Sequence, residues 1–393
     1  MTDLEKFMAL SPGFVPSEAQ VLLEMAQQAY SNAPSAPTCG VPPVPAPSGW
    51  TVVTSLTPTT ATLLDNYWQV WQNQNNPLQY AIAIRGTIDT DVSALADLLF
   101  PLINARIDFK LDGMQLAFNL AQDEGNSPVK AGVHSGFALS LLLMLFTTDS
   151  PLFSTLVQLA LTGGSEVYIT GHSQGASIAT LLTSLVRHST QFFAGPSYKT
   201  YTFAPAKPGN DHYAYDYDQL AGIIGYGWAV VSTQDWVPQL PLTLESLRTI
   251  NTPNPLFKFG GALSALPASS VTPWTAANEA EIQAARAAAA ARLRLRVDEL
   301  AARLKAETIH LNKRDLGGTA DPVTGSSIAD LIEQIPDEIQ DSLNFAKAGA
   351  LVPLFATPGG NPTDGTSNCQ PFDAFWQHHL GNYLKYLNAQ YQS

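Results

Sequence analysis

The chain has 393 residues, of which 45% are hydrophobic and 13% are charged, so its composition is globular and it can bury a core. Its 33 acidic and 20 basic side chains give a formal net charge of −13, which opposes binding to nucleic acid or to anionic membrane surfaces. No run of 18 uncharged apolar residues occurs, so we expect no transmembrane helix. Cys39 and Cys369 are too few for a disulfide framework or a zinc site, and they are either free thiols or one optional bridge.

The first elements in chain order are a helix and an extended connection. Ser17 and Gln20 have the spacing of a capping box, and the following apolar residues predict an amphipathic helix that ends near Tyr30. Residues 34–47 are rich in proline, so they are expected to be an extended surface connection. Residues 1–20 lack the basic and apolar regions of a secretory signal, so we expect a cytoplasmic protein, or one secreted by a route that is not visible here.

Short apolar segments that read as buried strands alternate with helical stretches in the first part of the chain: 80–84, 167–170, 200–203 and 229–232. This alternation predicts an α/β fold with a mainly parallel central sheet and helices on both faces. We expect one domain over residues 1–393, with its ligand site at the carboxyl ends of the strands.

Residues 272–311 are expected to form one long helix. Thr272 can cap it, Pro273 suits its first position, and the alanine-rich run that follows has a high helix propensity. Four apolar residues recur at alternating spacings of four and three: Leu293, Val297, Leu300 and Leu304. Such a narrow seam is typical of a helix packed on its own molecule or of a coiled-coil dimer, so the oligomeric state stays open.

The sequence Gly171-His172-Ser173-Gln174-Gly175 follows the strand predicted at 167–170 and precedes helix-forming residues. A serine on a sharp turn between strand and helix needs glycines beside it, because the backbone there is strained and crowded. We therefore interpret Ser173 as a catalytic nucleophile, although the pentapeptide alone could be an ordinary loop. The amino end of the helix would place its positive dipole near a developing oxyanion.

Together with further motifs, this turn resembles the class 3 lipases, the fungal-type triacylglycerol lipases and their relatives in the α/β-hydrolase superfamily. The resemblance covers roughly 17–239 and 345–393, and it includes Arg85-Gly86-Thr87, Val133 to Phe137 and Asp235 to Pro241. Ala204 stands where the family mostly has glycine. Residues 244–335 have no counterpart in compact members, so we expect a helical insertion, a cap or docking element, before the last strand.

The resemblance implies which groups stabilise an oxyanion. The backbone N–H groups of Thr87 and Gln174 are the candidates for the oxyanion hole. Gln174 replaces the usual leucine, which is harmless because only its backbone N–H is needed. The apolar segment 95–103 corresponds to the region that forms a lid in the family, and a buried core helix is the alternative.

A serine hydroxyl needs a histidine to take its proton and an acid to orient that histidine. Asp235 is the predicted acid, because it follows the strand at 229–232 at the carboxyl edge of the sheet. This fold places the base after the last strand, where His378 and His379 are adjacent. We choose His378, because Leu380 and Tyr383 follow it at the spacing common in the family. His172 and His134 are interpreted as structural.

These residues predict hydrolysis of the carboxylic esters of acyl lipids, with no cofactor and no metal. The substrate would be an acyl ester lipid, met in solution or at a lipid–water interface. Triacylglycerol lipase or carboxylesterase activity is the first hypothesis; phospholipase A1 or another carboxylesterase, such as a feruloyl esterase, is the alternative. A catalytically silent interaction protein is the hypothesis from a different class.

Overall fold

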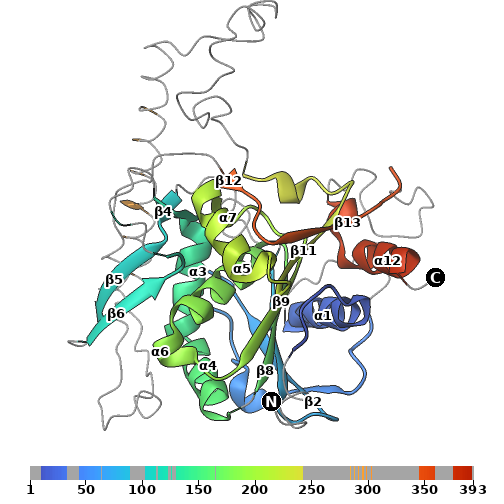
Figure 1. Cartoon of the computed structure of the whole chain (residues 1–393), viewed down its shortest axis with the longest axis horizontal. Helices are drawn as coiled ribbons and strands as arrows, with labels where there is room; N and C mark the ends of the chain where they lie inside the picture. The colour runs from blue at the N-terminus through green and yellow to red at the C-terminus, as the bar shows by residue number, and fades with distance from the viewer. Residues whose placement is uncertain are drawn as a thin grey trace, which may run out of the picture.

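The computed structural model of the protein describes these residues: 10–32, 44–88, 102–241, 345–358 and 375–391, with short gaps at 63, 112–113, 123–124, 126–129 and 164, and isolated positions between 284 and 302. The described part is organised around one central sheet with helices on both sides (Figure 1). In this part of the chain, no helix is both long and apolar enough to cross a membrane.

The central sheet has seven strands in the order β1-β2-β3-β8-β9-β11-β13. The five strands from β3 to β13 are parallel, and β1 and β2 are added antiparallel at one edge. The bounds are β1 Trp50–Val52, β2 Trp68–Asn73, β3 Gln79–Ile84, β8 Glu166–His172, β9 Ser197–Phe203, β11 Gly227–Ser232 and β13 Ala350–Leu354. All seven residues of β8 are buried, as a central parallel strand covered on both faces requires.

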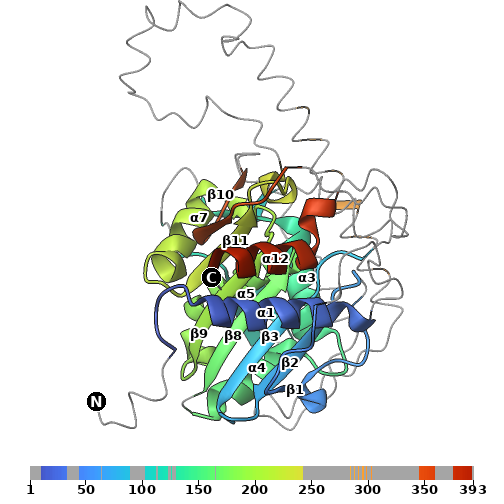
Figure 2. The same cartoon turned by 90° about the vertical axis from the view of Figure 1, so that its right-hand side faces the viewer.

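Helices cover the two faces of this sheet as separate layers. Helices α1 and α12 lie side by side on one face (Figure 2), and α5, with α3 and α4, covers the other. The bounds are α1 Pro16–Gln28, α3 Ser135–Phe146, α4 Leu152–Leu161, α5 Gln174–His188, α6 Thr190–Phe193, α7 Asp211–Tyr217 and α12 Leu380–Tyr391. The first and last described helices therefore meet, although they are far apart in the sequence.

Shorter elements complete the described fold. A second sheet has the order β12-β10-β7-β4, and β5 and β6 form a hairpin. The bounds are β4 Leu102–Asn104, β5 Arg106–Leu111, β6 Met114–Asn119, β7 Gly132–His134, β10 Gly209–Asn210 and β12 Phe345–Ala346. Short turns of helix occur at η2 Ala29–Asn32, η3 Thr54–Leu56, η4 Asp218–Gly222, η5 Val237–Gln239 and η7 Trp376–His378.

The structure confirms the four strands predicted from apolar segments and corrects two local predictions. Helix α1 begins at Pro16 after Val15, without a side-chain cap, so the capping box at Ser17 is wrong; proline fixes the backbone at the first helical position instead. The predicted lid at 95–103 ends in β4, where Leu102 and Ile103 are fully buried and pair with β7. These two residues belong to a sheet, and residues 95–101 lie outside the described residues.

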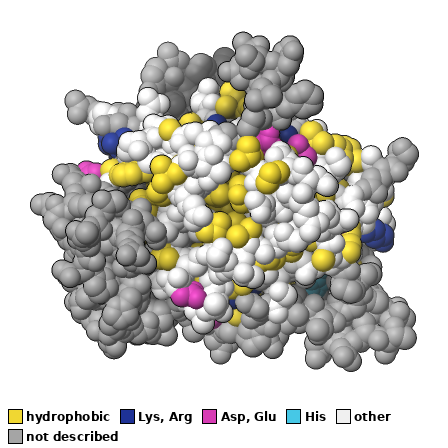
Figure 3. All heavy atoms as spheres, turned by 90° about the horizontal axis from the view of Figure 1, so that it is seen from below, with side chains coloured by type: hydrophobic (Ala, Val, Ile, Leu, Met, Phe, Trp, Pro, Cys, Tyr) yellow, Lys and Arg dark blue, Asp and Glu magenta, His cyan; other side chains and the backbone are white. Residues whose placement is uncertain are grey.

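Several predictions fall mainly outside the described part of the chain. Within the insertion at 244–335, isolated described positions such as Ala284, Ala291 and Asp298 are helical, and the seam residues Leu293, Val297, Leu300 and Leu304 lie outside the description. Cys39 and Cys369 also lie outside it. Viewed from the lower end of Figure 1, the coloured surface carries scattered hydrophobic side chains and few charged ones, in line with the low content of charged residues (Figure 3).

Candidate active site

Ser173 lies on a strained turn between β8 and α5. Its backbone has φ 58° and ψ −130°, in the region that residues with a Cβ atom avoid. A Cβ atom on Gly171 would lie 2.4 Å from the carbonyl oxygen of Gly175, and one on Gly175 would lie 2.4 Å from that of Ile84. The turn therefore needs both glycines, and holding its serine in this conformation costs about 1–3 kcal/mol.

Asp235 and His378 meet at the same carboxyl edge of the sheet. Asp235 follows β11, and its Oδ2 lies 2.7 Å from His378 Nδ1. Both residues are buried. A carboxylate accepts hydrogen bonds, so this contact places a proton on Nδ1 and leaves Nε2 to face a different partner.

His379 has different surroundings from its neighbour. Its ring packs edge-on against Trp376 at a centroid distance of 6.1 Å, and its carbonyl accepts from the N–H groups of Asn382 and Tyr383 at the start of α12. The structure thus brings His378, not His379, to Asp235, in agreement with the residue chosen from the sequence. The catalytic role of His378 remains a prediction.

Tyr383 is a third residue at this acid that the sequence reasoning did not assign. Its hydroxyl donates to Asp235 Oδ2 at 2.7 Å, and Val237 N–H donates to Oδ1 at 3.0 Å. Burial is the main reason that the pKa of Tyr383 is raised well above its usual value, so the hydroxyl keeps its proton and remains a donor. The only signal in the sequence was the spacing of Tyr383 from His378, which reports a motif but no contact.

The loop after β3 passes directly over the nucleophile. A Cβ atom on Gly86 would lie 2.4 Å from the carbonyl oxygen of His172 and 3.0 Å from Ser173 Cβ, so only glycine fits there. Thr87 is the next residue, and Gln174 is the first residue of α5. The predicted oxyanion pair therefore belongs to two segments that pack against each other at Ser173.

Other residues singled out in the sequence have structural surroundings. His134 is fully buried and stacks on Phe137 with a centroid distance of 4.0 Å, as expected of a packing residue. Ala204 has φ 52°, which explains why glycine is usual there in the resembling family. In the described part of the chain, no three His, Cys, Asp or Glu side chains are grouped as metal ligands.

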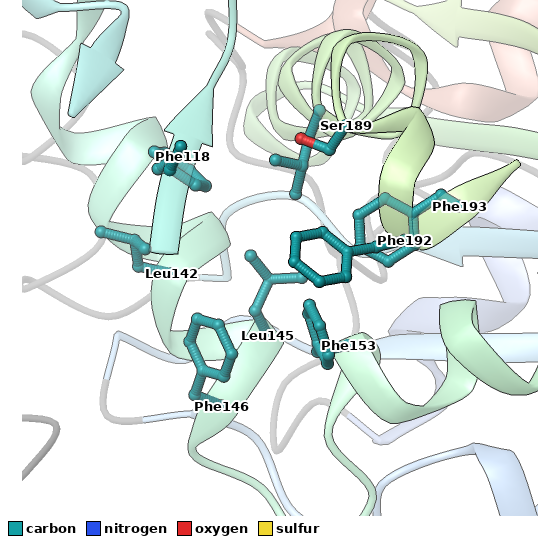
Figure 4. A pocket seen from close by; sticks show the side chains of 10 residues that line it. Phe118, Leu142, Leu145, Phe146, Phe153, Ser189, Phe192 and Phe193 are labelled. Carbon is teal, nitrogen blue, oxygen red and sulfur yellow. The ribbon is translucent and has the colours of Figure 1, made fainter. Parts of the chain in front are cut away.

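A small cavity is lined by Leu185 and Ser189 at the carboxyl end of α5, whereas Ser173 precedes the amino end of this helix. Figure 4 shows the side chains around the cavity. The cavity measures about 30 Å³ and is lined mostly by phenylalanine and leucine side chains, including Phe118, Phe146, Phe153 and Phe193. Its small volume and its lining by residues of α3, α4, α5 and α6 identify it as a gap in the packing between these elements.

Comparisons with known proteins agree with the motifs. The model of a family described as "Lipase (class 3)" matches residues 81–245. This match confirms the resemblance read from the sequence, and it supports a carboxylic ester hydrolase of the lipase kind. It covers Thr87, Ser173, Gln174 and Asp235 but not His378. No curated protein matches the sequence.

Solved structures of fungal lipases are also similar to the chain. They include a lipase propeptide complex from Rhizomucor miehei (19% identity, TM-score 0.39) and a lipase from Rhizopus microsporus var. chinensis (21% identity, TM-score 0.40). Each match covers 57% of this chain, with 63% of the first structure and 69% of the second. The chain thus spans less than two thirds of the length of the Rhizomucor miehei complex chain.

Proposed function

We propose that this protein hydrolyses the carboxylic esters of acyl lipids through an acyl-enzyme formed on Ser173. The observation that carries the proposal is the 2.7 Å contact between His378 Nδ1 and Asp235, at the same sheet edge as the strained turn of Ser173. A serine, an acid and a histidine, in this order along the chain, form the catalytic group of serine hydrolases with the α/β-hydrolase fold.

The roles of the residues follow from their chemistry. His378 takes the proton of the Ser173 hydroxyl as Oγ attacks the ester carbonyl, and later gives it to the leaving alcohol. Asp235 holds the ring through Nδ1 and stabilises the imidazolium that forms. Water then attacks the acyl-enzyme, with His378 again as the base, and the carboxylic acid leaves.

The tetrahedral intermediate carries a negative charge that needs donors. The backbone N–H groups of Thr87 and Gln174, beside Ser173, are proposed to bind it, each contributing on the order of 3 kcal/mol. The dipole of α5 points its positive end at the same place, because Ser173 directly precedes that helix.

A neutral acyl glycerol suits this protein better than an anionic substrate, since the net charge is −13. Phospholipase A1 and feruloyl esterase activities use the same chemistry and are the alternatives. Rates on p-nitrophenyl esters of increasing chain length, on emulsified triacylglycerol and on phospholipid vesicles separate these activities. A step in rate above the solubility limit of the substrate indicates a lipase, whereas a smooth hyperbola indicates an esterase with an open pocket.

The decisive experiment is labelling with a fluorophosphonate probe, together with turnover of a short p-nitrophenyl ester. Ser173→Ala should lose the label and about a thousandfold or more in kcat, with Tm within a few degrees of wild type. Ser177→Ala is the matched control, because Ser177 lies on the same helix and its hydroxyl donates to the carbonyl of Ala206. Activity of Ser173→Ala above a tenth of wild type overturns the proposal, and a wild-type protein that neither labels nor turns over substrate points to a silent interaction protein.

A further inference from the structure

His172, the residue before the nucleophile, connects two parts of the site. Its Nδ1 lies 2.9 Å from the Tyr30 hydroxyl, and its Nε2 lies 2.8 Å from the backbone carbonyl oxygen of His378. The Tyr30 oxygen lies in turn 3.1 Å from the backbone nitrogen of Gly86. A continuous chain of contacts therefore runs from the loop that precedes Thr87 to the backbone of His378.

The direction of each hydrogen bond follows from the chemistry of the groups. A backbone carbonyl only accepts, so His172 Nε2 carries the hydrogen that reaches His378. Burial, and then the neighbouring His378, lower the pKa of His172 well below its usual value, so the ring is neutral and its Nδ1 accepts the Tyr30 hydroxyl hydrogen. The Tyr30 oxygen in turn accepts from Gly86 N–H, so each of these three donors meets an acceptor.

This chain fixes both sides of the reacting centre. His378 is held at its ring by Asp235 and at its carbonyl by His172. The Gly86 loop rests against Tyr30, where a Cβ atom on Gly86 would come within 2.4 Å of the tyrosine oxygen. A base and an oxyanion loop on separate segments must keep their mutual distance, since small displacements of reacting groups cost large factors in rate.

We propose that Tyr30 and His172 are positioning residues for ester hydrolysis, which hold the oxyanion loop and the base at a fixed separation. The inference rests on the proposed function of Ser173, Asp235 and His378. Tyr30 lies in η2 directly after α1, outside the family match at 81–245, so a segment that the match does not cover contributes to the site.

The test compares variants that keep or remove these hydrogen bonds. Tyr30→Phe removes one hydroxyl, and kcat should fall roughly tenfold with KM within about twofold. His172→Phe removes both ring hydrogen bonds, and kcat should fall roughly a hundredfold. His172→Gln keeps one donor and one acceptor, so it should retain about a third or more of the wild-type kcat.

Comparing kcat between His172→Phe and His172→Gln shows whether His172 positions the site or only fills space. If His172 only fills space, the aromatic Phe variant should be closer to wild type in kcat than the Gln variant. Tyr198→Phe is the matched control for Tyr30→Phe, because it also removes one buried hydroxyl, which donates to the carbonyl of Phe193. Tyr198 lies near the start of β9, whereas the site lies at the carboxyl ends of the strands. Tyr198→Phe should leave kcat unchanged.

Two further results decide the inference. Tyr30→Phe combined with His172→Phe should lose less than the product of the single losses, since both act through one hydrogen-bond chain. Wild-type kcat in Tyr30→Phe and His172→Phe overturns the inference, while an inactive Ser173→Ala in the same assay leaves the proposed function standing. An active Ser173→Ala overturns both.

Discussion

The two faces of the central sheet are covered in different ways. The face under α3, α4 and α5 is packed with aliphatic and aromatic side chains, and eleven residues of α3 are buried. The face under α1 and α12 has a carboxylate near its surface: half-buried Glu18 accepts hydrogen bonds from the buried side chains of Lys199 at 2.6 Å, Tyr201 at 2.7 Å and Tyr168 at 2.9 Å. Buried hydroxyls of α5, such as that of Thr183, which lies 2.6 Å from the Thr200 hydroxyl, also form hydrogen bonds on the first face, but on the second face the acceptor is a charged carboxylate paired with a lysine.

This difference matches what each face contributes to the site. His378 and Tyr383 adjoin or lie on α12, and Tyr30 follows α1, so the second face supplies the predicted base and side chains that support the site, while Gln174, a predicted oxyanion donor, begins α5 on the first face. Apolar contacts are non-directional and tolerate small shifts, whereas hydrogen bonds fix distance and angle. The carboxylate of Glu18 joins α1, the helix that precedes Tyr30, to β9 through Lys199 and Tyr201.

The largest effect is expected at the base that the second face supplies. His378→Ala should lower kcat by several decades, because Ser173 then has no group to take its proton. His379→Ala should cost much less than one decade, since that ring packs on Trp376. Steady-state turnover of both variants tests this prediction. A larger loss of kcat in His379→Ala than in His378→Ala would move the base to His379.

A smaller loss is expected where α12 supports the acid. Tyr383→Phe removes a donor to Asp235, and kcat should fall about tenfold with KM little changed. The matched control is Tyr386→Phe on the same helix, whose hydroxyl donates to Gln377 instead. Equal turnover in the two variants would show that the hydroxyl of Tyr383 does not orient Asp235.

Leu181, in the core under the first face, should affect stability alone. Leu181→Ala in α5 opens a cavity in a fully buried cluster, and the free energy of unfolding should fall by about 2–5 kcal/mol. Its kcat should stay within about twofold of wild type. Glu18→Gln, on the second face, weakens the hydrogen bonds between α1 and β9 and should lower both the free energy of unfolding and kcat. Denaturant unfolding and steady-state turnover of both variants test this contrast. Equal kcat values for Leu181→Ala and Glu18→Gln would contradict it.

The smallest effect is a pH dependence of stability from His172. Its folded-state pKa lies well below the ordinary 6.5, so below that pH the unfolded chain binds a proton that the folded chain does not. The stabilisation is complete above pH 6.5 and is lost as pH falls, by at most about 1.4 kcal/mol per pH unit. Unfolding of His172→Gln should lack this component; parallel curves for the variant and wild type between pH 8 and 5 would contradict it.

Local sequence signals predicted the parts of the fold that depend on neighbours in the chain. The apolar strands and the turn at Ser173 were found because burial on both faces and the flanking glycines leave a pattern within a few residues. The predicted capping box was wrong because Pro16 alone sets the start of α1. Leu102 and Ile103 were assigned to a lid because strong apolarity does not distinguish a lid from a buried strand.

Contacts between distant segments could not be predicted in the same way. His172 was interpreted as structural, and Tyr30 was only the expected end of a helix, because their contacts reach across the chain to Gly86 and His378. Asp235 and His378 were predicted as acid and base from their positions after strands, which indicate an edge of the sheet but no distance. The hydrogen bond between them needed coordinates.

The pairing of α1 with α12 has a consequence for protein synthesis. On a ribosome that adds roughly 5–20 residues per second, the turn at Ser173 leaves the tunnel on the order of ten seconds or more before His378. Helix α12 is the last described element to emerge, and its docking beside α1 brings the base to Asp235. Under the proposed mechanism, the nascent chain should therefore be inert toward esters until this final helix arrives, and a product truncated before residue 375 should stay inert.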